Sequence, residues 1–242
     1  MVRGLPVAGL SMSRLARIME ILRAEREGGT LLGSVCRAAV AALGASGAGL
    51  TLLTTSHRGP ICSHGEFASF GEDLQLSLGE GPSGDAFATR ELVEVTDLSS
   101  SGGERWPVFS QAMTEAGVTS MASFPLRIGG ARFGALTLYR SSFGELSFEQ
   151  VADGYVVTQI ASHLIIAGQA QVGEDSVIPE IEAGFVRMEP LHQATGMVMA
   201  QLGIGAEDAL ARLRGAAFGS GRTLLDMSAH IVLGQMELPR DG

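Results

Sequence analysis

Residues 188–232 read MEPLHQATGMVMAQLGIGAEDALARLRGAAFGSGRTLLDMSAHIV, and this stretch decides the fold of the C-terminal part of the chain. Apolar residues recur in it at helical spacing, and glycines at 203, 205, 219 and 221 mark two tight turns. Thr223 and Asp226 have the spacing of a capping box at the start of a last helix. The pattern predicts three short helices packed through small and methionine side chains. It shows no set of residues suited to catalysis.

This segment resembles the ANTAR domain, a three-helix RNA-binding module of bacterial transcription antitermination regulators. The resemblance rests on Gln193-Ala194-Thr195-Gly196, Met199, Glu207-Asp208-Ala209, Arg212-Leu213-Arg214 with Ala217, and Leu224-Leu225-Asp226-Met227-Ser228-Ala229. It implies that RNA stem-loops are the partner and that polar side chains on the helices contact them. The candidate RNA-binding residues are His192, Gln193, Thr195, Arg212, Arg214 and Arg222.

The charge of the chain does not favour indiscriminate binding to nucleic acids. The net charge is −9, and all 17 basic residues are arginine. Residues 186–236 hold four arginines against Glu189, Glu207, Asp208 and Asp226, so this module is neutral. Binding to duplex DNA rewards strong positive charge through counterion release. A protein–protein or DNA-binding role for these helices therefore stays an alternative, and the charge fits a protein partner better than DNA.

The region before this module changes its periodicity several times, which predicts an α+β domain with an antiparallel sheet and flanking helices. Helices are expected at 12–27, 31–43, 106–116 and 148–170, and strands at 49–55, 66–70, 75–78, 92–95, 120–128 and 132–140. Gly129-Gly130 predicts a two-residue hairpin turn between the last two strands. Ser147 and Gln150 form a capping box at the start of the last helix.

This region resembles a GAF domain, a small-molecule sensing module. The resemblance rests on Gly47-Ala48-Gly49-Leu50-Thr51-Leu52, on 78–86 (LGEGPSGDA), on Val95-Thr96-Asp97-Leu98, on 105–109 (RWPVF), on Phe124-Pro125-Leu126 and on 133–139 (FGALTLY). It implies a ligand pocket, for which the candidates are Ser83, Asp85, Trp106, Phe109 and Ser123. Turn geometry and core packing are the competing explanations for the 79–86 loop and for Trp106. The ligand, and any cofactor, is unknown at this stage.

The chain thus divides into an N-terminal helix (1–30), a GAF-like sensor (31–170), a linker helix (171–187) and an ANTAR-like module (188–236). Apolar residues at 177, 181, 184, 188, 191, 195, 198 and 202 alternate spacings of four and three, as in a coiled-coil seam. Two interpretations stay open: a dimeric linker in a homodimer, and an amphipathic helix packed on its own sensor domain. Pro190 predicts a hinge near Glu189-Pro190.

Enzymatic and metal-binding functions find little support in the sequence. His57, Cys62 and His64 fall in a segment predicted as a hairpin loop with no fourth ligand, so a solvated loop is favoured over a metal site. Some GAF proteins reduce methionine sulfoxide with paired thiols, but Cys36 on a helix and Cys62 in a loop do not suit such a pair. A GAF domain used only for dimerisation is a further alternative. No stretch is apolar over the length of a membrane span and no signal peptide is visible, so a cytoplasmic protein is expected.

Overall fold

A single antiparallel sheet organises the N-terminal part of the molecule. The computed structural model describes residues 12–26, 29–54, 58–170 and 177–238. Within this part of the chain the strand order is β2-β1-β5-β4-β3. The strands are β1 (Gly47–Leu53), β2 (Arg58–Gly65), β3 (Val93–Val95), β4 (Ser120–Ile128) and β5 (Ala131–Arg140). Gly129, at φ 57°, makes the predicted turn between β4 and β5.

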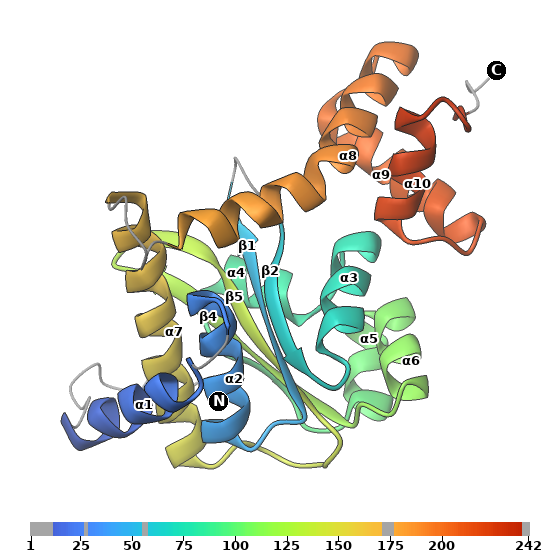
Figure 1. Cartoon of the computed structure of the whole chain (residues 1–242). Coiled ribbons are helices and arrows are strands. Elements are labelled where there is room, and N and C mark those ends of the chain that lie inside the picture. The colour runs from blue at the N-terminus through green and yellow to red at the C-terminus, as the bar shows by residue number, and fades with distance from the viewer. Residues whose placement is uncertain (1–11, 27–28, 55–57, 171–176, 239–242) are drawn as a thin grey trace.

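Helices cover both faces of this sheet (Figure 1). On one face lie α2 (Leu31–Leu43) and α7 (Phe148–Ala170), with α1 (Met12–Ala24) packed against both. On the other face lie α3 (Ala68–Leu78), α4 (Pro82–Thr89), the π-helical turn η1 (Leu98–Gly102), α5 (Gly103–Arg105) and α6 (Pro107–Glu115). Because side chains alternate along a strand, neighbouring residues of β4 enter different cores. Ala122 and Phe124 join the α2–α7 core, and Met121 joins the core under α3–α6.

Local signals in the sequence set the ends of the helices on the α2–α7 face. Ser147 and Gln150 exchange the two hydrogen bonds of the predicted capping box, 2.9 and 3.2 Å long, before α7. The Thr30 hydroxyl accepts a hydrogen bond from Gly33 N–H at the start of α2. Gly44 ends that helix in the left-handed conformation that glycine adopts without strain.

The C-terminal part is all helical. It consists of α8 (Ile178–Leu202), α9 (Ala206–Gly219) and α10 (Leu224–Val232), which enclose a third core. Figure 1 shows α8 crossing one end of the sheet and changing direction before it meets α9 and α10. Thr223 accepts a hydrogen bond from Asp226 N–H at 3.1 Å, which confirms the predicted start of the last helix.

Two of the predicted strands are wrong, because residues 66–70 and 75–78 belong to the approach to α3 and to α3 itself. Leu74, Leu76 and Leu78 alternate with polar residues, which is the period of a strand. In the helix, Leu74 and Leu78 pack on the core under α3–α6, whereas Leu76 packs on the C-terminal core. The alternation arises because α3 is buried on two opposite sides.

The segment predicted as a hairpin loop around Cys62 and His64 is also different, since it forms the edge strand β2. His57 lies outside the described residues. Of the turn expected at 79–86, only the beginning is observed, where Gly79 and Gly81 have positive φ. From Pro82, its first residue, the chain forms α4.

The regularly spaced apolar residues of the linker pack against other parts of the same chain. Val177 packs against Gly168, Gly184 against Ile61, and Met188 against Gly59. Farther along α8, Leu191 and Val198 are buried in the C-terminal core. Of the two interpretations of this seam, the structure therefore shows the intrachain helix, and α8 runs through Pro190 without a break.

Candidate functional site

A polar cluster is buried between α3 and the sheet, and we call Thr51, Glu72, Gln75 and Tyr139 the buried polar cluster. The Tyr139 hydroxyl donates to Glu72 Oε1 at 2.7 Å, and the Thr51 hydroxyl donates to Glu72 Oε2. Gln75 Nε2 donates to the Tyr139 oxygen at 3.0 Å, and Gln75 Oε1 accepts from Ser83 N–H at 2.8 Å. Every member thus has a partner inside the protein, as buried polar groups require.

Two glycines make room for this cluster. A Cβ atom at Gly49 would lie 2.4 Å from Cγ of Glu72, and one at Gly71 would lie 2.3 Å from Cε1 of Tyr139. The sequence signal was therefore a pair of glycines facing an acid and a tyrosine across α3 and the sheet. Strands at 66–70 and 75–78, as the sequence predicts them, do not place Gly71 and Glu72 on one helix, so this signal is not recognisable from the sequence.

Burial decides the electrostatics of the cluster. It raises the pKa of Glu72 to about 7, although the hydrogen bonds from Thr51 and Tyr139 act in the opposite direction. Burial also raises the pKa of Tyr139 well above its ordinary value, and the nearby Glu72 carboxylate adds to that effect. Near neutral pH the Glu72 carboxyl is consequently present in both protonation states.

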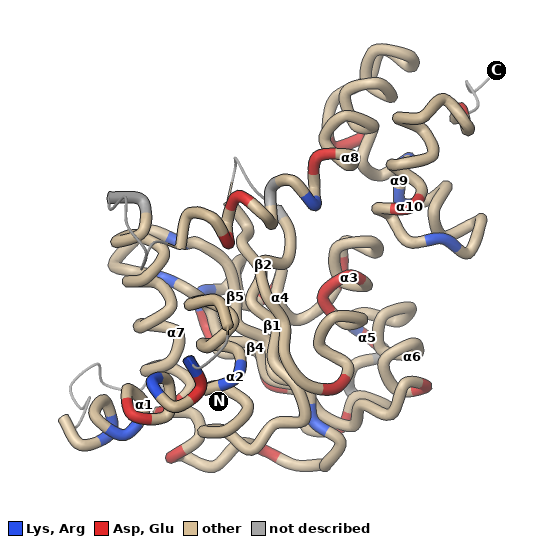
Figure 2. Tube along the Cα trace, in the orientation of Figure 1, with Lys and Arg blue, Asp and Glu red and all other residues tan. Residues whose placement is uncertain are grey.

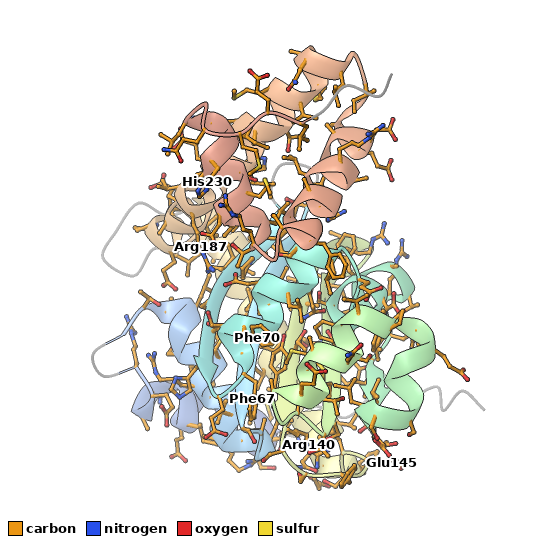
Figure 3. The ribbon with its side chains drawn as sticks, turned by 90° about the vertical axis from the view of Figure 1, so that its right-hand side faces the viewer. Phe67, Phe70, Arg140, Glu145, Arg187 and His230 are labelled. Carbon is orange, nitrogen blue, oxygen red and sulfur yellow. The ribbon has the colours of Figure 1, made fainter. Side chains whose placement is uncertain are left out.

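The outer side of α3 holds the C-terminal helices, and we call this contact the docking junction. It comprises Asp73, Leu76, Ser77, Arg187, Arg214 and Leu224. Arg187 Nη2 and Asp73 Oδ1 form an ion pair at 2.5 Å. Arg214 Nε donates to the Leu76 carbonyl at 3.3 Å, and Leu224 N–H donates to the Ser77 hydroxyl at 3.2 Å. Figure 3 shows Arg187 and His230 at this junction, with Phe70 of α3 below them.

One helix therefore links the interior of the sensor to the C-terminal helices. Glu72 and Gln75 project from α3 into the buried polar cluster, and Asp73, Leu76 and Ser77 project from it to the docking junction. The two sets of contacts are thus made by neighbouring residues of the same helix.

Known families match both halves of this arrangement. Residues 29–167 match the model of the GAF domain, and residues 189–232 match that of the ANTAR domain. The chain belongs to the GAF family. It carries an ANTAR domain after the GAF domain, which is the combination of a sensor with an RNA-binding antitermination module in a regulator of transcription.

Solved structures agree with the fold of the GAF domain. The GAF domain of a phosphoenolpyruvate-protein phosphotransferase from Acinetobacter is 16% identical, with a TM-score of 0.50 over 67% of this chain and 97% of that one. The GAF domain of such a phosphotransferase from Coxiella burnetii is also 16% identical, with a TM-score of 0.50 over 67% and 98%. At this identity both show the fold alone. No match was found among curated proteins.

The candidate pocket residues of the GAF domain lie mostly in its core. Trp106, Phe109 and Ser123 are buried, and so is Ser83 at the start of α4. The rings of Trp106 and Phe109 meet edge to face at 6.3 Å, and Ser123 pairs with Thr137 at 3.0 Å. Asp85 instead lies at the surface in an ion pair with Arg105. The structure thus groups four of the five candidates on the α3–α6 side of the sheet, where side chains fill the interior.

The candidate RNA-binding residues of the ANTAR domain fall into two groups. His192, Gln193, Arg212 and Arg222 are exposed, whereas Arg214 is partly buried at the docking junction. Thr195 is partly buried, with its hydroxyl bonded to the Leu191 carbonyl at 2.7 Å. Figure 2 shows few charged positions on these helices, with both signs among them. The positive charge of this domain thus rests on a small number of arginines.

The two cysteines lie together, contrary to the sequence-based expectation. Cys36 Sγ on α2 and Cys62 Sγ on β2 are 2.9 Å apart. His64 is exposed on the same strand, and no three potential metal ligands gather anywhere in the described residues. Within those residues, no helix combines the length and the apolar character needed to span a membrane.

Proposed function

We propose that this protein is a signal-responsive transcription antitermination regulator. Its ANTAR helices bind RNA hairpins, and its GAF domain controls that binding. A regulator of this kind acts on a nascent transcript, so the proposal places it in the cytoplasm.

The docking junction supports this proposal most directly. Arg214, a candidate RNA-binding residue, donates to the Leu76 carbonyl, and its guanidinium lies so close to Gly79 that a Cβ there would be 2.6 Å from Cζ. A cation at the carbonyl end of a helix is favourable, so α3 competes with a phosphate for this arginine. When the ANTAR domain separates from α3, the Arg214 guanidinium becomes available to an RNA phosphate.

The interior of the GAF domain supplies a reason for α3 to move. Trp106 and Phe109 fill the space between the sheet and the helices. A ligand that enters this space displaces side chains packed under α3, α4 and α6, and α3 carries the docking junction on its other side. The ligand must therefore favour the undocked state by its difference in affinity for the two states.

Recognition of RNA by this domain would rest on single-stranded bases more than on backbone charge. The module is neutral, and the exposed Arg212 and Arg222 can stack on unpaired bases or pair with single phosphates. His192 and Gln193 add exposed groups for hydrogen bonds to base edges. Hairpin loops offer such bases, whereas a duplex does not.

Fluorescence anisotropy tests the proposal with RNA stem-loops carrying hexanucleotide loops, singly and in tandem, against duplex DNA at two salt concentrations. We expect saturable, loop-dependent binding that Arg222→Ala weakens. Arg127→Ala, which removes an exposed arginine of the GAF domain, is the matched control and should bind as the unchanged protein does. Equal weak binding to every nucleic acid would contradict the proposal.

A protein partner for the ANTAR helices is the second candidate function. Phe218 and Leu233 are exposed over 65% and 68% of their surface, and the module is neutral. These features suit a protein surface better than duplex DNA. The homodimer expected from the linker also stays a prediction, for analytical ultracentrifugation to decide, because the seam that suggested it is buried within one chain.

A further inference from the structure

Cys36 and Cys62 form a thiol pair beneath α8. They are the only two cysteines of the chain, and their Sγ atoms are 2.9 Å apart. A disulfide bond is about 2.05 Å long, so the atoms lie about 0.9 Å beyond bonding distance. Cys36 is fully buried on α2, whereas Cys62 on the edge strand β2 is partly exposed.

We propose that this pair is a redox modification site: a hydroperoxide oxidises Cys36 and Cys62 to an intramolecular disulfide, and this lowers the affinity of the ANTAR domain for RNA. The effect on RNA rests on the proposed function, but the modification itself does not.

The oxidation balances in two steps. The Cys62 sulfur attacks one peroxide oxygen and the O–O bond breaks, which gives Cys62 sulfenic acid and one water or alcohol. The Cys36 sulfur then attacks the Cys62 sulfur, and the S–O bond breaks as the S–S bond forms. When the oxidant is hydrogen peroxide, its two oxygens and two hydrogens leave together with the two thiol protons as two molecules of water.

The environment assigns different roles to the two thiols. Cys62 is the less buried residue of the two and lies on the edge strand, so it is assigned the reaction with the oxidant, and Cys36, whose Sγ lies beside that of Cys62, closes the disulfide. The hydrogen bond with Cys36 raises the pKa of the Cys62 thiol, and burial and the charges of Glu180 on α8 and Glu72 on α3 raise it further. The thiolate is the nucleophile, so oxidation should be slow at neutral pH and accelerate as the pH rises.

Oxidation would act on the surface that holds α8. Cys62 Sγ donates to the Leu32 carbonyl at 3.2 Å, and a disulfide would replace this hydrogen bond between β2 and α2 by a covalent bond between the same two elements. The amides of Leu31 and Leu32 in the same turn of α2 donate to the carboxylate of Glu180, at 2.6 and 2.8 Å.

The neighbour of Cys62 on β2 also contacts the linker. A Cβ atom at Gly184 would be 2.7 Å from Cδ1 of Ile61. A bond between Cys36 and Cys62 joins the two elements on which the first half of α8 lies. We therefore expect it to hold α8 in place and to keep the ANTAR domain docked.

The test uses the full-length chain, reduced and then treated with one equivalent of hydrogen peroxide. Intact-mass spectrometry should show the loss of two hydrogen atoms, and a non-reducing gel should show a monomer. In Cys36→Ser, or Cys36→Ala if the serine variant does not fold, a dimedone adduct should form at Cys62. Cys62→Ser should give neither product.

RNA affinity and hydrogen exchange then measure the consequence. We expect at least a threefold weaker affinity for the stem-loop in the oxidised protein, with recovery on reduction, and slower amide exchange at Leu224 and along α9. The Cys36→Ser and Cys62→Ser variants should show neither change after peroxide.

The outcomes separate the two proposals. Sulfenic or sulfinic acid without a disulfide, or a bond between chains, would overturn the redox site. A disulfide that leaves both RNA affinity and exchange unchanged would overturn its regulatory role. Absence of RNA binding in both redox states would contradict the proposed function, while the mass and exchange measurements would still decide the redox site.

Discussion

At the scale of single residues, Glu72 is the least expected feature of the GAF domain, because a carboxyl group is buried there with no cationic side chain in hydrogen-bond contact. Its two oxygen atoms are satisfied by hydroxyl and amide donors. Its pKa of about 7 lies above the value of about 4.3 for an unfolded glutamate. Between these values the folded state holds the proton more tightly than the unfolded state. The contribution to stability is thus full below the lower value and is lost as the pH rises through the higher one.

Glu72→Gln should therefore flatten the pH dependence of stability. The free energy of unfolding of the unchanged protein should fall by up to about 3 kcal/mol as the pH rises from about 4.5 to above 7, since one pKa unit corresponds to about 1.4 kcal/mol. Urea denaturation at several pH values measures this slope. Glu104→Gln removes an exposed acid and should keep the slope; a slope that persists in Glu72→Gln would show that another group titrates.

Glycine at position 71 gives a second prediction for a single residue. Alanine normally stabilises a helix by up to about 1 kcal/mol relative to glycine. In Gly71→Ala the added Cβ would lie 2.3 Å from a ring atom of the buried Tyr139, so we expect a loss of about 1–3 kcal/mol instead. Gly196→Ala on α8, where no atom lies within 4 Å of the added Cβ, should show the normal gain. Equal effects at both positions in thermal unfolding would contradict the close contact in the buried polar cluster.

At the scale of elements, the sequence allowed most of the sheet and the long helices to be predicted, because their signals are local. Thr30 at the start of α2, the Ser147–Gln150 capping box and the Gly129 turn each act within a few residues. The errors around α3 and β2 lie where burial depends on partners far away in the chain. Leu76 is apolar because of the ANTAR core, and Cys62 lies on a strand that packs against α2.

The candidate site was only partly predictable for the same reason. The arginines of the ANTAR helices could be named from motif positions. Glu72 and Gln75 could not be named in this way. Their hydrogen bonds depend on Thr51 and Tyr139, which β1 and β5 place beneath α3. A local sequence pattern does not indicate a hydrogen-bond partner that lies 67 residues away.

The ion pair at the docking junction gives a prediction for α3. Asp73→Asn removes the partner of Arg187, and a partly exposed pair of this kind contributes up to about 1 kcal/mol. If docking competes with RNA, the affinity for a stem-loop should rise by about two- to fourfold, since about 1.4 kcal/mol corresponds to a factor of ten. Anisotropy titration measures this change. Glu115→Gln removes the same charge from an exposed position on α6 and serves as control; a similar rise there would indicate a general electrostatic effect.

At the scale of the whole molecule, α8 runs from the GAF domain into the ANTAR domain. Its first half lies over β2 and the start of α2, and its second half belongs to the ANTAR core. Pro190 lies between the halves and has no N–H for the carbonyl of Val186. The helix is therefore weakest where the domains meet.

Pro190→Ala should stabilise α8 at this position and reduce the effect of the GAF domain on RNA binding by the ANTAR domain. It restores a hydrogen bond and a residue of high helix propensity, which favours a straighter and stiffer α8. We expect a higher melting temperature and a smaller difference in RNA affinity between oxidised and reduced protein. Calorimetry and anisotropy measure the two effects. Ala200→Ser, an exposed change elsewhere on α8, should leave the difference intact; an undiminished difference in Pro190→Ala would contradict a hinge.

The carboxylate of Glu180 also has a consequence for how the chain is made. Leu31 and Leu32 emerge from a ribosome about 150 residues before the side chain to which their amides donate. The first turn of α2 then lacks this partner until the linker has been synthesised. A chain that stops at the end of α7 would keep this turn incomplete. The last hydrogen bonds of the first helix turn of the GAF domain are therefore supplied from beyond its own end.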